Sequence, residues 1–141
     1  MADVGPAFSL AIDAMGGDAA PEAVLDGLEL AAERHPGARF LLVGDEARVG
    51  AALARRKRAA KVCSLRHAPE VISGDLKPTA ALRMRGSSMR LAIDAVASGE
   101  AAGVVSAGNT GALMALAKIV IKTMPEIDRP ALAAIGPSAR G

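Results

Sequence analysis

The sequence predicts a doubly wound α/β fold, a three-layer α/β/α arrangement in which helices cover both faces of a mainly parallel sheet. Three observations lead to this prediction. Short apolar runs with strand character alternate with longer stretches of helical spacing. Glycine, proline and aspartate separate these segments along the 141 residues. The strand-like runs are apolar on both faces, which is typical of parallel strands that are covered on two sides and joined through helices.

The first half of the chain alternates strands and helices regularly. We expect strands at Phe8–Ala14, Arg39–Val43 and Lys61–Arg66, and helices at Pro21–Arg34 and Glu46–Lys57. Pro21 suits the first turn of its helix, where the missing N–H breaks no hydrogen bond. Glu22 and Asp26 lie near the positive end of the same helix dipole, and His35-Pro36-Gly37 ends the helix.

The second half continues this alternation after an irregular segment, Glu70–Pro78, that has no clear period. Residues Thr79–Ser98 have helical spacing, with a break marked by Gly86-Ser87-Ser88. A fourth strand follows at Gly103–Ser106, a helix at Asn109–Thr123 and a fifth strand at Pro130–Ile135. No repeat or linker divides the chain, so residues 1–141 are predicted to form a single α/β domain.

Composition excludes several classes of protein. The single cysteine, Cys63, cannot form a disulfide within the chain, and the start of the chain lacks a secretory pattern, so we expect a cytoplasmic setting. The most apolar stretch, Gly111–Ile121, reaches about half of the ~20 residues that a spanning helix needs. Phe8 and Phe40 are the only aromatic residues, which argues against a platform for stacking nucleic-acid bases.

No metal or cofactor is predicted. Neither the dinucleotide-binding pattern G-x-G-x-x-G nor the P-loop pattern G-x-x-x-x-G-K-[ST] occurs in the sequence. His35 and His67 have no cysteine, histidine or carboxylate at the spacing of metal ligands. Cys63 lies in a predicted strand and is expected to be a small core residue rather than a nucleophile.

The loop after the first strand is a candidate ligand site. Doubly wound sheets bind ligands beyond the carboxyl ends of their strands, where the strand order reverses. Gly16 and Gly17 let a ligand approach the backbone, and the start of the next helix favours an anion. Asp13 and Asp18 would repel phosphate unless they are turned away, paired or bridged by a cation. Alternatively, Asp18 caps the helix and the two glycines only form the turn.

The loop after the fourth strand carries the stronger signal. Ser106, Asn109 and Thr110 supply neutral hydrogen-bond donors, and Gly108 and Gly111 let the backbone close in. With no carboxylate in the loop, it suits a phosphate or the oxyanion of a tetrahedral acyl intermediate. Alternatively, Asn109 is an ordinary helix N-cap.

A third cluster lies between Arg83 and Arg90. Three arginines together with Ser87 and Ser88 could clamp a phosphate or the acidic surface of a partner. On the local pattern alone, a solvated helix face is the favoured interpretation.

Four segments together resemble the N-terminal part of the PlsX-type phosphate acyltransferases of bacterial lipid synthesis. They are IDAMGGDAAP (Ile12–Pro21), ALRMRGSSM (Ala81–Met89), VVSAGNTGALMA (Val104–Ala115) and IDRPALA (Ile127–Ala133). The resemblance implies a fold related to phosphotransacetylases and isopropylmalate dehydrogenases. It also implies transfer of a fatty acyl group from acyl carrier protein to inorganic phosphate, which gives acyl phosphate for phospholipid synthesis. Members of that family continue well past Gly141, so these residues are expected to be the N-terminal part of a longer enzyme.

The resemblance also implies partners and site residues. It implies a homodimer in the cytoplasm, associated peripherally with the membrane, that binds acyl carrier protein and no nucleic acid. Asn109, Ser106 and Thr110 are the predicted catalytic residues. The residues predicted to bind substrate or phosphate are Asp13, Gly16, Gly17, Asp18, Arg83, Ser87, Ser88, Gly108 and Gly111. Two alternatives stay open: a nucleotide-binding dehydrogenase-like enzyme, and an inactive truncated binding domain.

Overall fold

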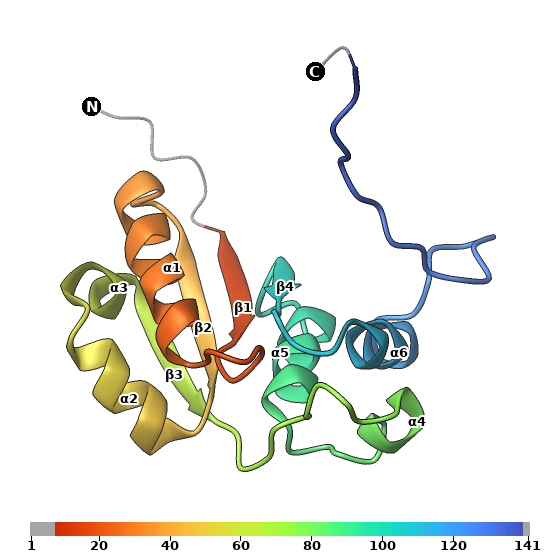
Figure 1. Ribbon diagram of the computed structural model, residues 1–141, viewed down its shortest axis with the longest axis horizontal. Coiled ribbons are helices and arrows are strands. Elements are labelled where there is room, and N and C mark those ends of the chain that lie inside the picture. The colour runs from red at the N-terminus through yellow and green to blue at the C-terminus, as the bar shows by residue number, and fades with distance from the viewer. Residues whose placement is uncertain (1–7, 140–141) are drawn as a thin grey trace.

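A four-stranded, all-parallel sheet forms the centre of the molecule (Figure 1). The structure is a computed structural model, and it describes residues 8–139. The strands lie in the order β3-β2-β1-β4. Their bounds are Ser9–Asp13 for β1, Arg39–Gly44 for β2, Cys63–His67 for β3 and Gly103–Val105 for β4. This arrangement confirms the predicted α/β class and the four strands of the first 106 residues.

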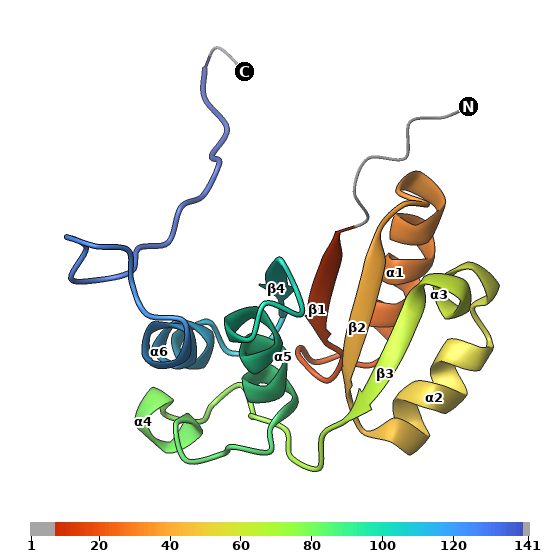
Figure 2. The same ribbon diagram turned by 180° about the vertical axis from the view of Figure 1, so that it is seen from behind.

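Helices cover both faces of this sheet, which gives three layers (Figures 1 and 2). Helices α1, α2 and α3 lie over one face, while α5 lies over the other and α4 and α6 pack beside it. Their bounds are Glu22–Arg34 for α1, Glu46–Ala54 for α2, Lys57–Val62 for α3, Pro78–Ala81 for α4, Ser88–Ala97 for α5 and Thr110–Val120 for α6. Among residues 8–139, no helix combines the length and apolar character that crossing a membrane requires.

Alternation along β1 places its side chains in two different clusters of the core. Ile12 points into a cluster with Leu25 and Leu28 of α1, whereas Ala11 packs in a separate cluster with residues of α5. Because successive side chains of a strand point to opposite faces, a strand buried on both sides carries apolar residues on both of its faces. This requirement explains the continuous apolar runs from which the strands were predicted.

The predicted helix at Glu46–Lys57 is two helices, α2 and α3. Arg56 interrupts them with an extended backbone (φ −119°, ψ 93°). Its guanidinium Nη2 lies 2.8 Å from Glu22 Oε2 and 2.7 Å from Asp26 Oδ1, which connects the break to α1. The predicted break at Gly86–Ser88 is confirmed, since α5 begins at Ser88.

The predicted fifth strand at Pro130–Ile135 is wrong. The structure assigns no strand to these residues, which leave the body of the molecule as an exposed extended segment (Figure 1). A strand needs a neighbour that takes up its backbone hydrogen bonds. Within residues 8–139, β4 pairs only with β1, and its outer edge stays open.

Candidate active site at the switch point of the sheet

The candidate site lies where the direction of strand addition reverses. The chain builds the sheet outward from β1 through β2 to β3, and then returns to place β4 on the other side of β1. The loops that follow β1 and β4 therefore emerge side by side at the carboxyl edge of the sheet, the place where open α/β sheets bind ligands. These are the two loops that the sequence singles out.

Glycine allows these two loops to touch. A Cβ atom on Gly16 would lie 2.7 Å from Asp13 Oδ2, 2.8 Å from Ser106 Oγ and 3.0 Å from the Gly108 nitrogen. Gly17 has a φ of +99°, in the left-handed region that side chains disfavour. The double glycine is therefore required by the close approach at Gly16 and by the backbone conformation at Gly17.

A buried carboxylate joins the loops to α5. Asp13 is 2% exposed, and its Oδ1 accepts hydrogen bonds from Ser88 Oγ at 2.6 Å and from the Met15 N–H at 3.2 Å. Its Oδ2 accepts from Ser106 Oγ at 2.7 Å, and Ser106 Oγ in turn accepts from the Gly108 N–H at 3.1 Å. We call Asp13, Ser88 and Ser106 the carboxylate cluster. It holds together three segments that are far apart in sequence.

The carboxylate cluster determines what its hydroxyl groups can do. A serine has one proton to donate, and each of these two serines donates it to the carboxylate. In this arrangement Ser106 has no proton left for an oxyanion, so its geometry is that of a positioning residue. Within residues 8–139, no lysine, arginine or histidine forms an ion pair with Asp13. The cluster therefore places a negative charge beneath the loops that is stabilised by hydrogen bonds alone.

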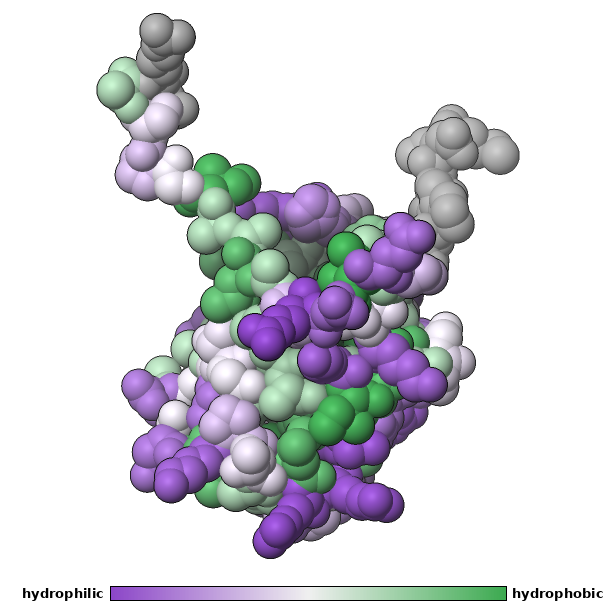
Figure 3. Space-filling model, turned by 90° about the vertical axis from the view of Figure 1, so that its right-hand side faces the viewer, coloured by the Kyte–Doolittle hydropathy of each residue, from purple (hydrophilic) through white to green (hydrophobic). Residues whose placement is uncertain are grey.

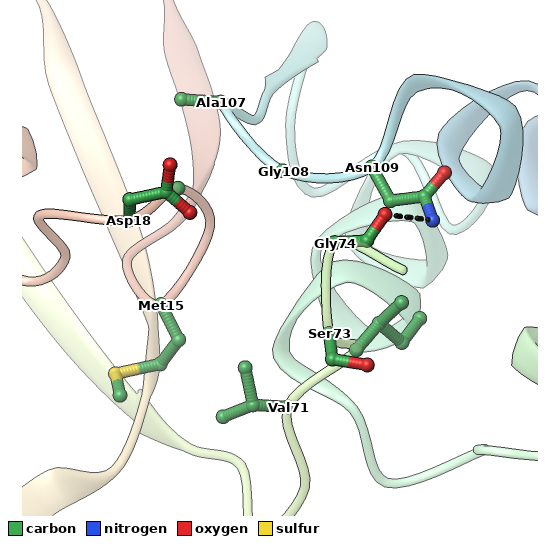
Figure 4. Close-up of a pocket in the computed structure, with 10 residues that line it drawn as sticks. Met15, Asp18, Val71, Ser73, Gly74, Ala107, Gly108 and Asn109 are labelled. Atoms are coloured by element: carbon green, nitrogen blue, oxygen red, sulfur yellow. Dashed lines mark hydrogen bonds between the residues drawn. The ribbon is translucent and has the colours of Figure 1, made fainter. Parts of the chain in front are cut away.

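An open hollow of about 430 Å³ lies above these loops (Figure 4). Asp18 borders it on one side, and Ser73, Gly74 and Asn109 face it across the gap. Its full lining is Met15, Gly17, Asp18, Val71, Ile72, Ser73, Gly74, Ala107, Gly108 and Asn109. This volume lies within the range of small-molecule sites.

Asn109 shapes one wall of the hollow. Its Oδ1 accepts from the Ala112 N–H at 3.0 Å, so Asn109 caps α6 as the alternative interpretation expected. Its Nδ2 donates to the Gly74 carbonyl at 3.1 Å and to the Leu76 carbonyl at 2.8 Å (Figure 4). One side chain therefore starts the helix and fixes the 74–76 segment, which lies on the same side of the hollow.

The charge in the hollow is negative or neutral. Its lining contains the carboxylate of Asp18, which is exposed, and no lysine, arginine or histidine. Asp18 does not cap α1, whose N-cap is Pro21 with no side-chain hydrogen bond. The anion-binding groups that this part of the chain offers are peptide N–H groups, since the first turn of α6 directs its N–H groups toward this end.

Several predicted residues lie outside the hollow. Arg83 is not among its lining residues, and Ser87 caps α5, donating to the Met84 carbonyl at 2.9 Å and accepting from the Arg90 N–H at 3.2 Å. Thr110 and Gly111 begin α6 just beyond the lining. The catalytic and phosphate-binding roles assigned to these four residues stay predictions. The roles assigned to the residues that line the hollow stay predictions as well.

The segment from Val71 to Gly74 was missed by the sequence analysis. It connects β3 to α4 and supplies four of the ten lining residues. Its lack of any period, together with a glycine in a connection that no helix or strand explains, was the available signal. Long irregular connections in a compact domain are often functional.

Among the described residues, no group of three or more histidine, cysteine, aspartate or glutamate side chains could hold a metal ion. Cys63 lies at the start of β3, away from the hollow. Burial, and to a lesser extent the charge of Glu29, raises the pKa of its thiol from 9.0 to about 11.

Cys63 should therefore react slowly in the folded chain. At pH 8 the raised pKa makes the reactive thiolate about a hundredfold scarcer than in an unperturbed thiol. Alkylation by iodoacetamide, followed by mass spectrometry, is expected to be slower by about that factor in buffer than in about 8 M urea, a denaturing concentration. Equal rates would show that Cys63 is not protected.

Comparison with known proteins identifies a family for the chain. Residues 8–141 match the family described as "Fatty acid synthesis protein". The chain is 70% identical over 134 residues to the phosphate acyltransferase of Granulibacter bethesdensis and 64% identical to that of Gluconobacter oxydans, covering 95% of this chain in each case. It spans 36% of the length of each of these relatives, at their N-terminal end.

Proposed function

Because the chain belongs to the fatty acid synthesis protein family, we propose that it forms the phosphate-side part of a phosphate acyltransferase. The proposed reaction transfers a fatty acyl group from acyl carrier protein to inorganic phosphate. The observation that carries this proposal is the meeting of the two glycine-containing loops at the switch point, beside a hollow that is lined by Asn109, the N-cap of α6. A dehydrogenase-like activity is not favoured, since the relatives that match carry the other name.

The proposed reaction has three steps. A phosphate oxygen attacks the carbonyl carbon of the thioester, a tetrahedral oxyanion forms, and the carbon–sulfur bond then breaks. The thiolate of acyl carrier protein leaves and takes up a proton, and acyl phosphate remains. Phosphate must be held against the carbonyl, and N–H donors that are already in place must stabilise the oxyanion. The N–H groups at the start of α6 and in the loop after β1 are suited to these two tasks.

The charge of the hollow adds a further part to the proposal. Phosphate is an anion, while Asp13 and Asp18 are carboxylates and the described lining lacks a cationic side chain. Peptide dipoles at one helix end contribute up to about 1 kcal/mol at an exposed site, which does not outweigh two nearby negative charges. We infer that a basic group supplied from outside this lining balances the phosphate. The segment that the relatives carry beyond the matched third is the proposed source.

The remaining parts of the proposal concern the whole polypeptide. We propose that it acts in the cytoplasm as a homodimer, docks acyl carrier protein and contacts the membrane surface from one side. These features rest on the family to which the chain belongs, and a pull-down with acyl carrier protein and a sedimentation experiment would test them directly.

Asn109→Ala should sharply reduce formation of acyl phosphate. The variant loses the cap of α6 and both ties to the 74–76 segment, so the wall that Asn109 and Gly74 form together loses its fixed position. We expect turnover to fall at least about tenfold and the free energy of unfolding by about 1–2 kcal/mol, a usual cost for a lost cap. The assay would use a chimera in which the unmatched C-terminal part of the Granulibacter relative follows residue 141.

Asp45→Ala is the matched control for this experiment. Asp45 caps α2 by accepting from the Arg48 N–H at 3.0 Å, and it lies outside the hollow. It should lose similar stability and keep its turnover. Unchanged turnover in Asn109→Ala would remove this loop from the mechanism, and an inactive parent chimera beside an active Granulibacter enzyme would contradict the proposed activity.

A further inference from the structure

One face of β4 is uncovered. In the parallel pairing of β1 with β4, Ala11 lies opposite Val104 and Ile12 opposite Val105. Paired residues of neighbouring strands point to the same face of the sheet. Val104 therefore faces α5, whereas Val105 shares the face that α1 covers over β1. Ile12 on that face is 5% exposed, and its neighbour Val105 is 51% exposed.

Because α1 covers β1 but not β4 on this face, an apolar groove of about 350 Å³ lies between α1 and β4. One wall is the flank of α1, with Ala23, Gly27 and Ala31 at four-residue spacing, and the other is β4 with Val105. The floor is formed by Leu10, Ile12 and Phe40 together with Val24 and Leu28. The side of α1 that borders the groove thus carries small residues, which would let another element pack closely.

The topology indicates what belongs in this groove. Parallel sheets are buried on both faces, because their strands are joined by helices that cover them. Right-handed crossovers place the helix that follows β4 on the α5 side, and α6 already lies there. A crossover from β4 to a further strand therefore leaves the α1 side of β4 open. Only an element from elsewhere in the polypeptide can cover it.

A second observation indicates that packing partners lie outside these residues. The segment after α6 is exposed although it carries large apolar side chains, among them Met124 and Leu132, which are 74% and 70% exposed. Figure 3, which faces this side of the molecule, shows hydrophobic residues along the base of the C-terminal tail. The relatives contain further polypeptide, since this chain spans 36% of their length.

We propose that the groove between α1 and β4 is the docking surface for a helix with an apolar face, contributed by the part of the family's polypeptide beyond the matched third. The helix would lie beside α1 and cover Val105. This inference does not depend on acyl transfer, because it rests on the coverage of the sheet.

Thiol labelling at two positions that line the groove tests this proposal. Val105→Cys and Gly27→Cys would each be made in a Cys63→Ala background, both in the 141-residue chain and in the chimera with the Granulibacter C-terminal part. Gly27 is exposed and an added Cβ there meets nothing within 4 Å, so at least this variant should fold normally. We expect both introduced thiols to react at least about tenfold more slowly in the chimera, since a buried thiol loses access to the reagent.

Ala51→Cys is the control. Ala51 is exposed on α2, remote from the groove, and the thiol introduced there should react equally in both proteins. Full reactivity of the two groove thiols in the chimera would overturn the proposal. Protection that grows with the concentration of the 141-residue chain would assign the groove to a second copy, and protection that needs an added fatty acyl ligand would assign it to lipid. Either result would also overturn the proposal.

Discussion

Asp13→Ala is expected to unfold at a clearly lower urea concentration, with a loss of about 3 kcal/mol in the free energy of unfolding. The substitution removes the acceptor of three hydrogen bonds, from Ser88 Oγ, Ser106 Oγ and the Met15 N–H. These donors are buried or partly buried, and donors left unsatisfied away from water cost about 1–3 kcal/mol each before water or rearrangement compensates.

The same variant should lose catalysis in the chimera. The carboxylate cluster holds the loop after β4 against the loop after β1, so its loss lets both sides of the hollow move. A misplacement of about 1 Å can cost about a hundredfold in rate, and we expect a loss of at least that size. Asp13→Asn keeps the shape and one acceptor oxygen, and should retain more stability and more activity than Asp13→Ala.

Urea denaturation of the 141-residue chain followed by circular dichroism measures the change in stability. Asp18→Ala is the matched control, because Asp18 lies in the same loop but is exposed, and it should change stability by less than about 0.5 kcal/mol. A double-mutant cycle with Ser88→Ala should give a coupling energy of about 1 kcal/mol or more. Independent, additive effects would show that the cluster is not a connected unit.

The sequence predicts most of the fold because the spacing of apolar residues follows from which faces of each strand and helix are buried. The strand around Ile12 carries apolar residues on both of its faces, since both faces are buried, and the helix beginning at Glu22 has the apolar spacing of a surface helix. The strand predicted at Pro130–Ile135 has the same local pattern and still forms no strand. A strand requires a paired neighbour, which local composition does not encode.

The candidate site is predicted in part for the same reason. Gly16 and Gly108 mark the two loops, and the order of the strands brings the loops together. The burial of Asp13 was not foreseen, because it depends on Ser88, which is 75 residues away in the sequence. The wall formed by Ser73 and Gly74 was also missed, since an irregular connection has no period to recognise. Both the burial of Asp13 and the position of the Ser73–Gly74 wall depend on contacts between segments that are distant in sequence, which local patterns do not show.

Gly16→Ala is expected to separate the two loops and cost about 3 kcal/mol in the free energy of unfolding, at the upper end for an overpacked buried site. The added methyl would lie 2.7 Å from Asp13 Oδ2 and 2.8 Å from Ser106 Oγ, closer than real Cβ contacts allow, and at a tight 3.0 Å from the Gly108 nitrogen. The Asp13 side chain cannot turn away without breaking the carboxylate cluster, and Gly108 can yield only through its backbone. Acyl phosphate formation by the chimera should fall with it, at least about tenfold, because the same shift moves the loop that carries Asn109.

Gly27→Ala is the matched control, because it makes the same chemical change at a glycine inside α1 where the new methyl meets nothing within 4 Å. Alanine is the better helix former by about 0.5–1 kcal/mol, so this variant should be more stable than the parent chain. Opposite signs for the two substitutions would locate the effect in the contact between the loops rather than in the loss of a glycine. A decrease below about 1 kcal/mol in Gly16→Ala would mean that the loops can move apart freely, and the carboxylate cluster would then not fix the shape of the site.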